Sequence, residues 1–211
     1  MGIIRQEEAR RYLSLRQGVK MSLCFGTNHI NKDYEVIFQA FQSVPRDSCY
    51  LLFARSLVTD DRTRDPSLLA QKYGCVENTI VVNQFVSESE KIYYFSASDA
   101  IILSNVQSFI ASTSLINEAC QFSLPVIASD MGQLGDYVTN YNLGLLFLPD
   151  NPGSLRQAIT SFLHLGEDEK QAMKANFHRF ASDLSWREVA ERYKALYLRQ
   201  IPAPLPESPK A

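Results

Sequence analysis

Short apolar segments alternate with longer amphipathic ones along most of the chain, and this alternation limits the possible folds more than any other feature. Six apolar segments have strand length: Met21–Phe25, Tyr50–Ala54, Thr79–Phe85, Ala100–Leu103, Pro125–Ala128 and Gly144–Leu148. Helical segments lie between most of them, at Asp33–Ser43, Pro66–Tyr73, Glu88–Ser96 and Leu115–Phe122. Nearly continuous apolar strands separated by helices are typical of a parallel sheet covered on both faces. The sequence therefore predicts an α/β fold with a doubly wound parallel sheet of about six strands.

Three further helices are predicted after the last strand, at Pro152–Leu165, Glu167–Ser182 and Trp186–Gln200. We expect Trp186 to be the buried anchor of the last helix, together with Val189, Ala190, Tyr193 and Leu196. Residues 201–211 contain four prolines, which predicts an extended, flexible tail; an inert terminus is favoured over a partner-binding one. The predicted organisation is one domain over residues 1–200 followed by this tail.

Composition and charge exclude several classes of protein. The hydrophobic share of 45% and the charged share of 21% are ordinary for a globular domain. A net charge of −2 argues against nucleic-acid binding through bulk electrostatics. No apolar run reaches the length of a membrane helix, and the first residues do not resemble a signal peptide. Peripheral membrane contact is left open.

The four cysteines and three histidines form no recognisable site. The cysteines are scattered singly, which predicts reduced, mostly buried thiols and a cytoplasmic protein. The histidines have no metal-ligand spacing, so we expect no bound metal.

Ligands of a doubly wound sheet bind outside the carboxyl ends of its strands, so the loops there are the candidate site. The loop after the first strand has no GxGxxG motif, and Arg55 ends the second strand where a dinucleotide-binding fold has an acid. A nicotinamide dinucleotide is therefore disfavoured. Asn31 is the predicted N-cap of the next helix, which places Lys32 in its first turn. The helix dipole disfavours a cation there, so a bound anion would explain Lys32; a chance surface lysine is the alternative.

A second candidate for anion binding is Ser112-Thr113-Ser114, immediately before the helix that contains Glu118. Capping of the helix accounts for one of these hydroxyl groups, and the others suit hydrogen bonds to a phosphate. Glu118 lies at the edge of the buried face of the helix. It is interpreted either as an ordinary acid near a helix N-terminus or as a carboxylate that accepts two hydrogen bonds from a diol such as a ribose.

The segment around Glu118 resembles a known family. Residues 118–130 read E-A-C-Q-F-S-L-P-V-I-A-S-D and are similar to the E-A-x-x-x-G-x-P-V-I-A-T-D of the retaining GT-B glycosyltransferases with an EX7E motif. Residues 131–138, 144–147 and 185–190 are similar to further segments of that family. Upstream, Phe25-Gly26 with Lys32 resembles its first phosphate-binding loop, and Ser98-Asp99-Ala100 resembles a strand entry. The resemblance is strongest over 117–149 and implies the C-terminal, Rossmann-like, donor-binding lobe.

The resemblance implies transfer of a hexose from a nucleoside-diphosphate sugar to an acceptor hydroxyl, with the nucleotide sugar as substrate and without a metal or another cofactor. It assigns the donor diphosphate to Lys32, Thr27, Ser112, Thr113 and Ser114. It assigns the ribose to Glu118 and the base to the backbone near Phe85 and Val86. No catalytic residue is assigned.

Several positions depart from the family pattern. Ile110 stands where the family has its first glutamate, Thr27 replaces the usual arginine, and Asp33 replaces a glycine. The serine-rich stretch replaces the Phe-Gly pair that frames the donor sugar. The family's other lobe, against which the end of the chain packs, lies outside these residues, so part of the last helix is expected to be exposed. Two interpretations remain: a glycosyltransferase lobe completed by an N-terminal lobe or partner chain, and a non-catalytic nucleotide-binding or scaffold module.

Overall fold

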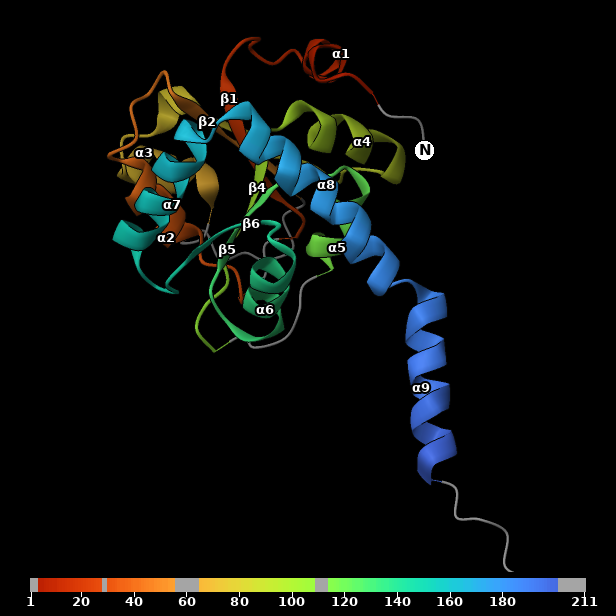
Figure 1. Ribbon diagram of the computed structural model, residues 1–211. Helices are drawn as coiled ribbons and strands as arrows, with labels where there is room; N and C mark the ends of the chain where they lie inside the picture. Colours follow the sequence, from red (N-terminus) through yellow and green to blue (C-terminus); the bar gives the residue numbers. More distant parts are fainter. Residues whose placement is uncertain (1–3, 28–29, 56–64, 109–113, 201–211) are drawn as a thin grey trace, which may run out of the picture.

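The computed structural model describes residues 4–27, 30–55, 65–108 and 114–200, which are built around one six-stranded sheet (Figure 1). Its strands are β1 (Lys20–Phe25), β2 (Cys49–Arg55), β3 (Thr79–Asn83), β4 (Ala100–Leu103), β5 (Val126–Ser129) and β6 (Gly144–Phe147). All pairings are parallel, and the strand order is β3-β2-β1-β4-β5-β6. The order reverses between β1 and β4, as in a doubly wound sheet. The predicted fold class is confirmed.

The helices of the described residues include all seven that the sequence predicts. These are α2 (Tyr34–Phe41), α3 (Pro66–Lys72), α4 (Glu88–Ala97), α5 (Leu115–Gln121), α7 (Pro152–His164), α8 (Glu167–Asp183) and α9 (Trp186–Gln200). Two further α-helices, α1 (Gln6–Tyr12) and α6 (Gly132–Tyr141), and the 3-10 helix η2 (Val76–Asn78) were not predicted. The residues of α1 show no apolar periodicity, and two glycines lie within α6, so neither segment carries an ordinary helix signal.

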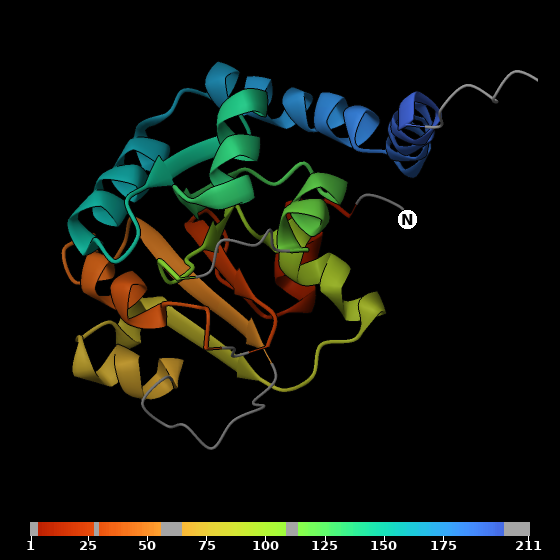
Figure 2. The same cartoon turned by 90° about the horizontal axis from the view of Figure 1, so that it is seen from below.

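Successive residues of each strand point to opposite faces of the sheet, and each face has its own core. In β2, Leu51 and Phe53 pack with α2, α3 and α7, whereas Leu52 and Ala54 pack on the face covered by α4, α5, α6 and α8. Figure 2 shows these two groups of helices on either side of the sheet. The strands read as continuous apolar runs because both of their faces are buried.

A buried charge cluster fixes α1 and the first strands at the amino end of the sheet. The Arg10 side chain is 3% exposed and donates to the Asp99 carboxylate at 2.9 Å and to the Val19 and Ala97 carbonyls. Asp99, which directly precedes β4, also accepts hydrogen bonds from the Met21 amide of β1 and from Lys20. The carboxylate therefore joins α1, β1 and β4 at one point.

The prediction of a buried Trp186 was wrong. The indole is 90% exposed, and Tyr193, Leu196 and Tyr197 of the same helix are each more than half exposed. Figure 1 shows α9 pointing away from the sheet and its covering helices. Apolar spacing predicted the helix correctly but not what covers it.

A search of the described residues for a helix long and apolar enough to cross a membrane found none.

We predict that Trp186→Ala changes the free energy of unfolding of this chain by no more than about 0.5 kcal/mol, because the side chain buries almost no surface. Chemical denaturation followed by far-UV circular dichroism measures the change. A loss of about 3–5 kcal/mol, the range for removal of a buried aromatic side chain, would show that the indole is packed in solution.

Candidate functional site

The carboxyl ends of β1 and β4 form the point at which the strand order reverses, and ligands of such sheets bind in the crevice there. The segments after these two strands are held together by backbone hydrogen bonds. The Asp33 amide donates to the Ser104 carbonyl at 3.0 Å, and the Val106 amide donates to the Asn31 carbonyl at 2.9 Å. Lys32 and Asn105 accordingly form a short antiparallel bridge. The residues after β1 thus have a fixed position relative to those after β4.

Ser129, the last residue of β5, stabilises this bridge through hydrogen bonds to the Asn105 backbone. Its side chain is completely buried, and its hydroxyl accepts a hydrogen bond from the Asn105 amide at 2.9 Å. The same hydroxyl lies 3.2 Å from the Asn105 carbonyl, to which it donates. A buried hydroxyl at the end of the neighbouring strand therefore fixes the backbone of Asn105, directly after β4.

Lys32 lies at the carboxyl end of β1, as the sequence predicts, but its local setting differs. Its ammonium donates to the Phe25 carbonyl at 2.7 Å, and a Cβ on Gly26 would lie 3.3 Å from Nζ. Gly26 has a φ of +91°, which favours glycine. The following Thr27 is exposed. The tight turn after β1 therefore brings the ammonium against the end of that strand.

The prediction of Asn31 as the N-cap was wrong, because Asp33 caps α2 and accepts a hydrogen bond from the Val36 amide at 3.1 Å. Lys32 thus precedes the helix instead of lying in its first turn. Burial raises the pKa of the Asp33 carboxyl; the bond from Val36 acts in the opposite direction, and the nearby Asp150 carboxyl adds to the rise.

The crevice also contains polar groups that sequence reasoning did not identify. The side chains of Ser104 and Asn105 are each 6% exposed, and Ser104 Oγ and Asn105 Nδ2 have no hydrogen-bond partner among the described residues. Both residues line a cavity of about 20 Å³ beside Lys32 and Cys24, enough for one water molecule. Burial raises the pKa of the Cys24 thiol, which keeps that wall neutral. A polar pair directly after an apolar strand was the available signal.

Glu118 lies in α5, and its carboxylate forms an ion pair with Lys91 of α4. The distance from Glu118 Oε2 to Lys91 Nζ is 2.8 Å, and the two side chains are 24% and 7% exposed. Lys91 also pairs with Glu88, at 2.6 Å. Burial lowers the pKa of Lys91, but hydrogen bonds and charges from the two glutamates outweigh it, so the pKa is raised and the ammonium stays charged at neutral pH.

The predicted base-binding residues follow β3 and lead directly into α4. Phe85 is 77% exposed, whereas Val86 is half-buried against the core. A capping box between Ser87 and Glu90 fixes the start of α4. Because Lys91 lies in the next turn, the Phe85–Val86 segment and Glu118 are linked through one helix.

The serine-rich stretch is only partly described. Ser112, Thr113 and the Ile110 position lie outside the described residues. Ser114 is the N-cap residue of α5, is exposed, and makes no side-chain capping hydrogen bond. Ser114 is therefore not the residue whose hydroxyl caps the helix, and the other two hydroxyl residues of this stretch lie outside the described residues.

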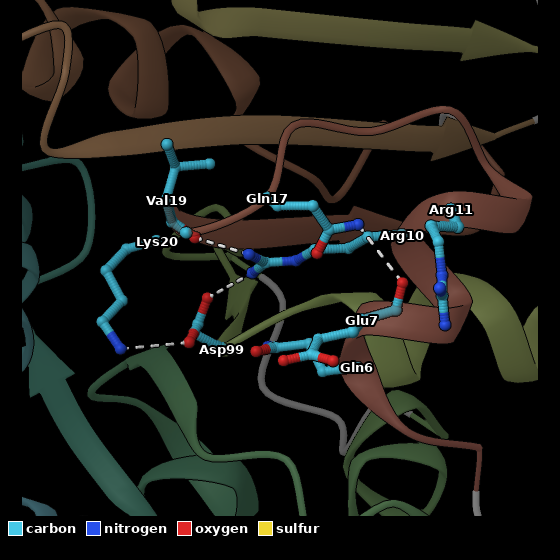
Figure 3. Close-up of a pocket in the computed structure, with 9 residues that line it drawn as sticks. Gln6, Glu7, Arg10, Arg11, Gln17, Val19, Lys20 and Asp99 are labelled. Atoms are coloured by element: carbon cyan, nitrogen blue, oxygen red, sulfur yellow. Dashed lines mark hydrogen bonds and ion pairs between the residues drawn. The ribbon is translucent and has the colours of Figure 1, made fainter.

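A larger hollow of about 460 Å³ lies at the opposite, amino edge of the sheet, between α1 and the start of β1 (Figure 3). Figure 3 shows that Arg10, Lys20 and Asp99 in its wall point at one another. These charges stabilise the fold, and the hollow lies away from the strand ends at which such sheets bind ligands. The described residues include no group of three His, Cys, Asp or Glu side chains placed to hold a metal ion.

We predict that Ser129→Ala lowers the free energy of unfolding by about 1–3 kcal/mol, because it leaves the buried Asn105 amide without its acceptor. Ser22→Ala is the control, since Ser22 is 2% exposed in the nearby β1 and the partner that the described residues offer its hydroxyl is the weak acceptor or donor Cys49 Sγ. Equal losses in the two variants, measured by urea denaturation, would contradict the role assigned to Ser129.

Solved structures with the same fold include glycosyltransferases. Sucrose-phosphate synthase from Thermosynechococcus elongatus is 22% identical, with a TM-score of 0.72 over 93% of this chain and 50% of that one. Anabaena Alr3699/HepE in complex with UDP and glucose is 15% identical, with a TM-score of 0.71 over 93% of this chain and 52% of that one. The chain therefore spans about half the length of these proteins.

One similar structure is a single lobe. The C-terminal domain of a glycosyl transferase group 1 family protein (LpcC) from Francisella tularensis is 13% identical, with a TM-score of 0.69 over 87% of this chain and 93% of that one. No match was found among curated proteins. The family model described as glycosyl transferases group 1 matches residues 5–179, from just before α1 into α8. The chain thus belongs to the glycosyl transferases group 1 family.

Proposed function

We propose that this chain is the donor-binding lobe of a glycosyltransferase that moves a hexose from a nucleoside-diphosphate sugar to an acceptor hydroxyl. The observation that carries the proposal is the position of a cation and a carboxylate on the segments that follow β1 and β4, the two strands between which the strand order reverses. The Lys32 ammonium lies at the end of β1, and the Glu118 carboxylate lies on the helix that follows β4. A nucleoside diphosphate needs this combination: positive charge for its phosphates and an acceptor for its ribose.

Lys32 would act on the diphosphate. Negative charge develops on the leaving diphosphate as the glycosidic bond to the nucleotide breaks, and a fixed positive group stabilises that charge most strongly in a dry cleft. The exposed hydroxyl of Thr27 and the groups around Ser112, Thr113 and Ser114 would add hydrogen bonds. Thr27 stands where the family has an arginine, so Lys32 would neutralise most of the charge of the diphosphate. No metal ion takes part in this proposal.

Glu118 would bind the ribose, and the segment at Phe85 and Val86 would meet the base. A carboxylate that accepts two hydrogen bonds from a diol selects a ribonucleoside. The short path from Val86 through α4 to the Lys91–Glu118 ion pair supports a common site for base and ribose.

A second lobe, supplied by further sequence or by a partner chain, would bind the acceptor and close the cleft. The chain spans about half the length of the two-lobed relatives above, and the exposed aromatic side chains of α9 suit an interface with another lobe. We also propose a reducing compartment such as the cytoplasm, because all four cysteines are free and three of them are buried.

Calorimetric titration with UDP, ADP and GDP tests nucleotide binding directly. We predict weak binding of at least one of them, and a loss of about 1.5–3 kcal/mol in Glu118→Gln, because a charged acceptor is lost. Glu77→Gln is the control, since Glu77 is an exposed carboxylate in an ion pair with Arg46 near the start of β3. Unchanged affinity in a folded Glu118→Gln variant would contradict the ribose role.

The same proposal requires that the isolated chain transfers no sugar. Alignment of donor and acceptor accounts for roughly 7–11 kcal/mol of such a barrier, and one lobe cannot provide it. Labelled nucleotide sugars with a panel of acceptors measure transfer, with and without an N-terminal-lobe protein. Transfer by the monomer that disappears in Lys32→Ala would refute the requirement for a second lobe. Nucleotide binding without transfer in either mixture would favour the non-catalytic interpretation.

A further inference from the structure

We propose that Lys91 is a positioning residue, which holds the Glu118 carboxylate in the orientation that a ribose diol requires and thereby determines selectivity for ribonucleotides. The inference rests on the proposed function, because it assumes that Glu118 meets the ribose. It adds a residue of α4 to the site, and that residue does not itself contact the nucleotide.

The geometry of the ion pair separates the two oxygens of Glu118. Oε2 is shielded from solvent and lies 2.8 Å from Lys91 Nζ. A ligand therefore does not reach the carboxylate through Oε2. Lys91 is the one ion-pair partner that the structure describes for Glu118, so its ammonium is the contact that biases the orientation of the carboxylate.

The burial of Lys91 makes the pair sensitive to its loss. The side chain is 7% exposed and reaches two carboxylates, of which Glu88 is 81% exposed and Glu118 is 24% exposed. A carboxylate oxygen that is buried without a counter-charge is strongly disfavoured, so without Lys91 the Glu118 carboxylate would turn outward to solvent. That rotation removes the arrangement of acceptors that distinguishes a diol from its deoxy analogue.

The position of Lys91 is set independently of Glu118. The capping box at Ser87 and Glu90 fixes the start of α4, and Phe95 of the same helix stacks on Phe122 at the end of α5, with ring centroids 4.9 Å apart. The ring stack joins the two helices near their C-terminal ends, and the capping box holds the first turn of α4, so the ammonium is presented to Glu118 from a well-formed helix. A flexible surface ion pair would not have this support.

Glu88 provides a matched control, because it forms the second ion pair of the same ammonium but faces solvent. Glu88→Gln removes one carboxylate from Lys91 and leaves Glu118 and its contact in place. An effect of the local charge balance alone would appear in this variant as well. An effect that depends on the orientation of Glu118 would not.

The experiment compares UDP, ADP and GDP with their 2′,3′-dideoxy counterparts by calorimetric titration, in the wild type and in Lys91→Met, Lys91→Arg and Glu88→Gln. The measured quantity is the ratio of the two affinities within one variant. Partial unfolding or a general loss of stability weakens both nucleotides alike and leaves this ratio unchanged. We expect a wild-type ratio of about 10-fold or more in favour of the ribonucleotide.

In Lys91→Met the ratio should fall to about 1, and Lys91→Arg should recover most of it because the positive charge returns. Glu88→Gln should keep the wild-type ratio. A wild-type ratio that persists in Lys91→Met would overturn the positioning role and leave the proposed function intact. No nucleotide binding, or a ratio of about 1 in the wild type, would contradict the proposed function and this inference together. Loss of the ratio in both Lys91 variants would contradict the role of the positive charge.

Discussion

The parallel pairing of β1 with β4 is the contact on which the candidate site depends, and it is held from both ends. At the amino end, the Asp99 carboxylate binds the Met21 amide of β1 and the buried Arg10 of α1. At the carboxyl end, Ser129 holds the Asn105 backbone, and Asn105 is bridged to Lys32. The strand order reverses at this pair, where ligands of such sheets bind, and the segments that follow the two strands are joined by the Lys32–Asn105 bridge. A change in this pairing would move both sides of the site at once.

The charges around the crevice are arranged in compensated pairs. Lys32 is anchored to a carbonyl at the end of β1, and burial together with the nearby Asp150 carboxyl raises the pKa of the adjacent Asp33. Glu118 shares the buried ammonium of Lys91, which lowers the repulsion that a lone carboxylate would exert on a diphosphate. The same ion pair links the segment after β3 to the helix after β4. In the proposed function, this lobe binds the phosphates, the ribose and the base, and a second lobe binds the acceptor.

The fold was largely predictable from the sequence because strands that are buried on both faces appear as short, nearly continuous apolar segments. Helix α1 was missed because its residues show no apolar periodicity, and nothing in the sequence shows that its buried Arg10 meets Asp99. Trp186 was misassigned because apolar spacing identifies a face but not the surface that covers it. Within the site, the motif resemblance indicated Lys32 and Glu118, and the structure places them after β1 and β4. The ion pair between Lys91 and Glu118 was beyond prediction, since it joins two helices distant in the sequence.

The central claim is that a nucleoside diphosphate binds at the carboxyl ends of β1 and β4. Two-dimensional amide NMR of the isotope-labelled chain, titrated with UDP, ADP and GDP, tests it most directly because every assigned amide reports its own surroundings. The account predicts saturable shifts for Gly26, Thr27, Asn105 and Glu118 at the crevice, and none around the hollow beside α1 at the opposite edge of the sheet. Shifts confined to that opposite edge, or no saturable shift with any of the three nucleotides, would contradict it.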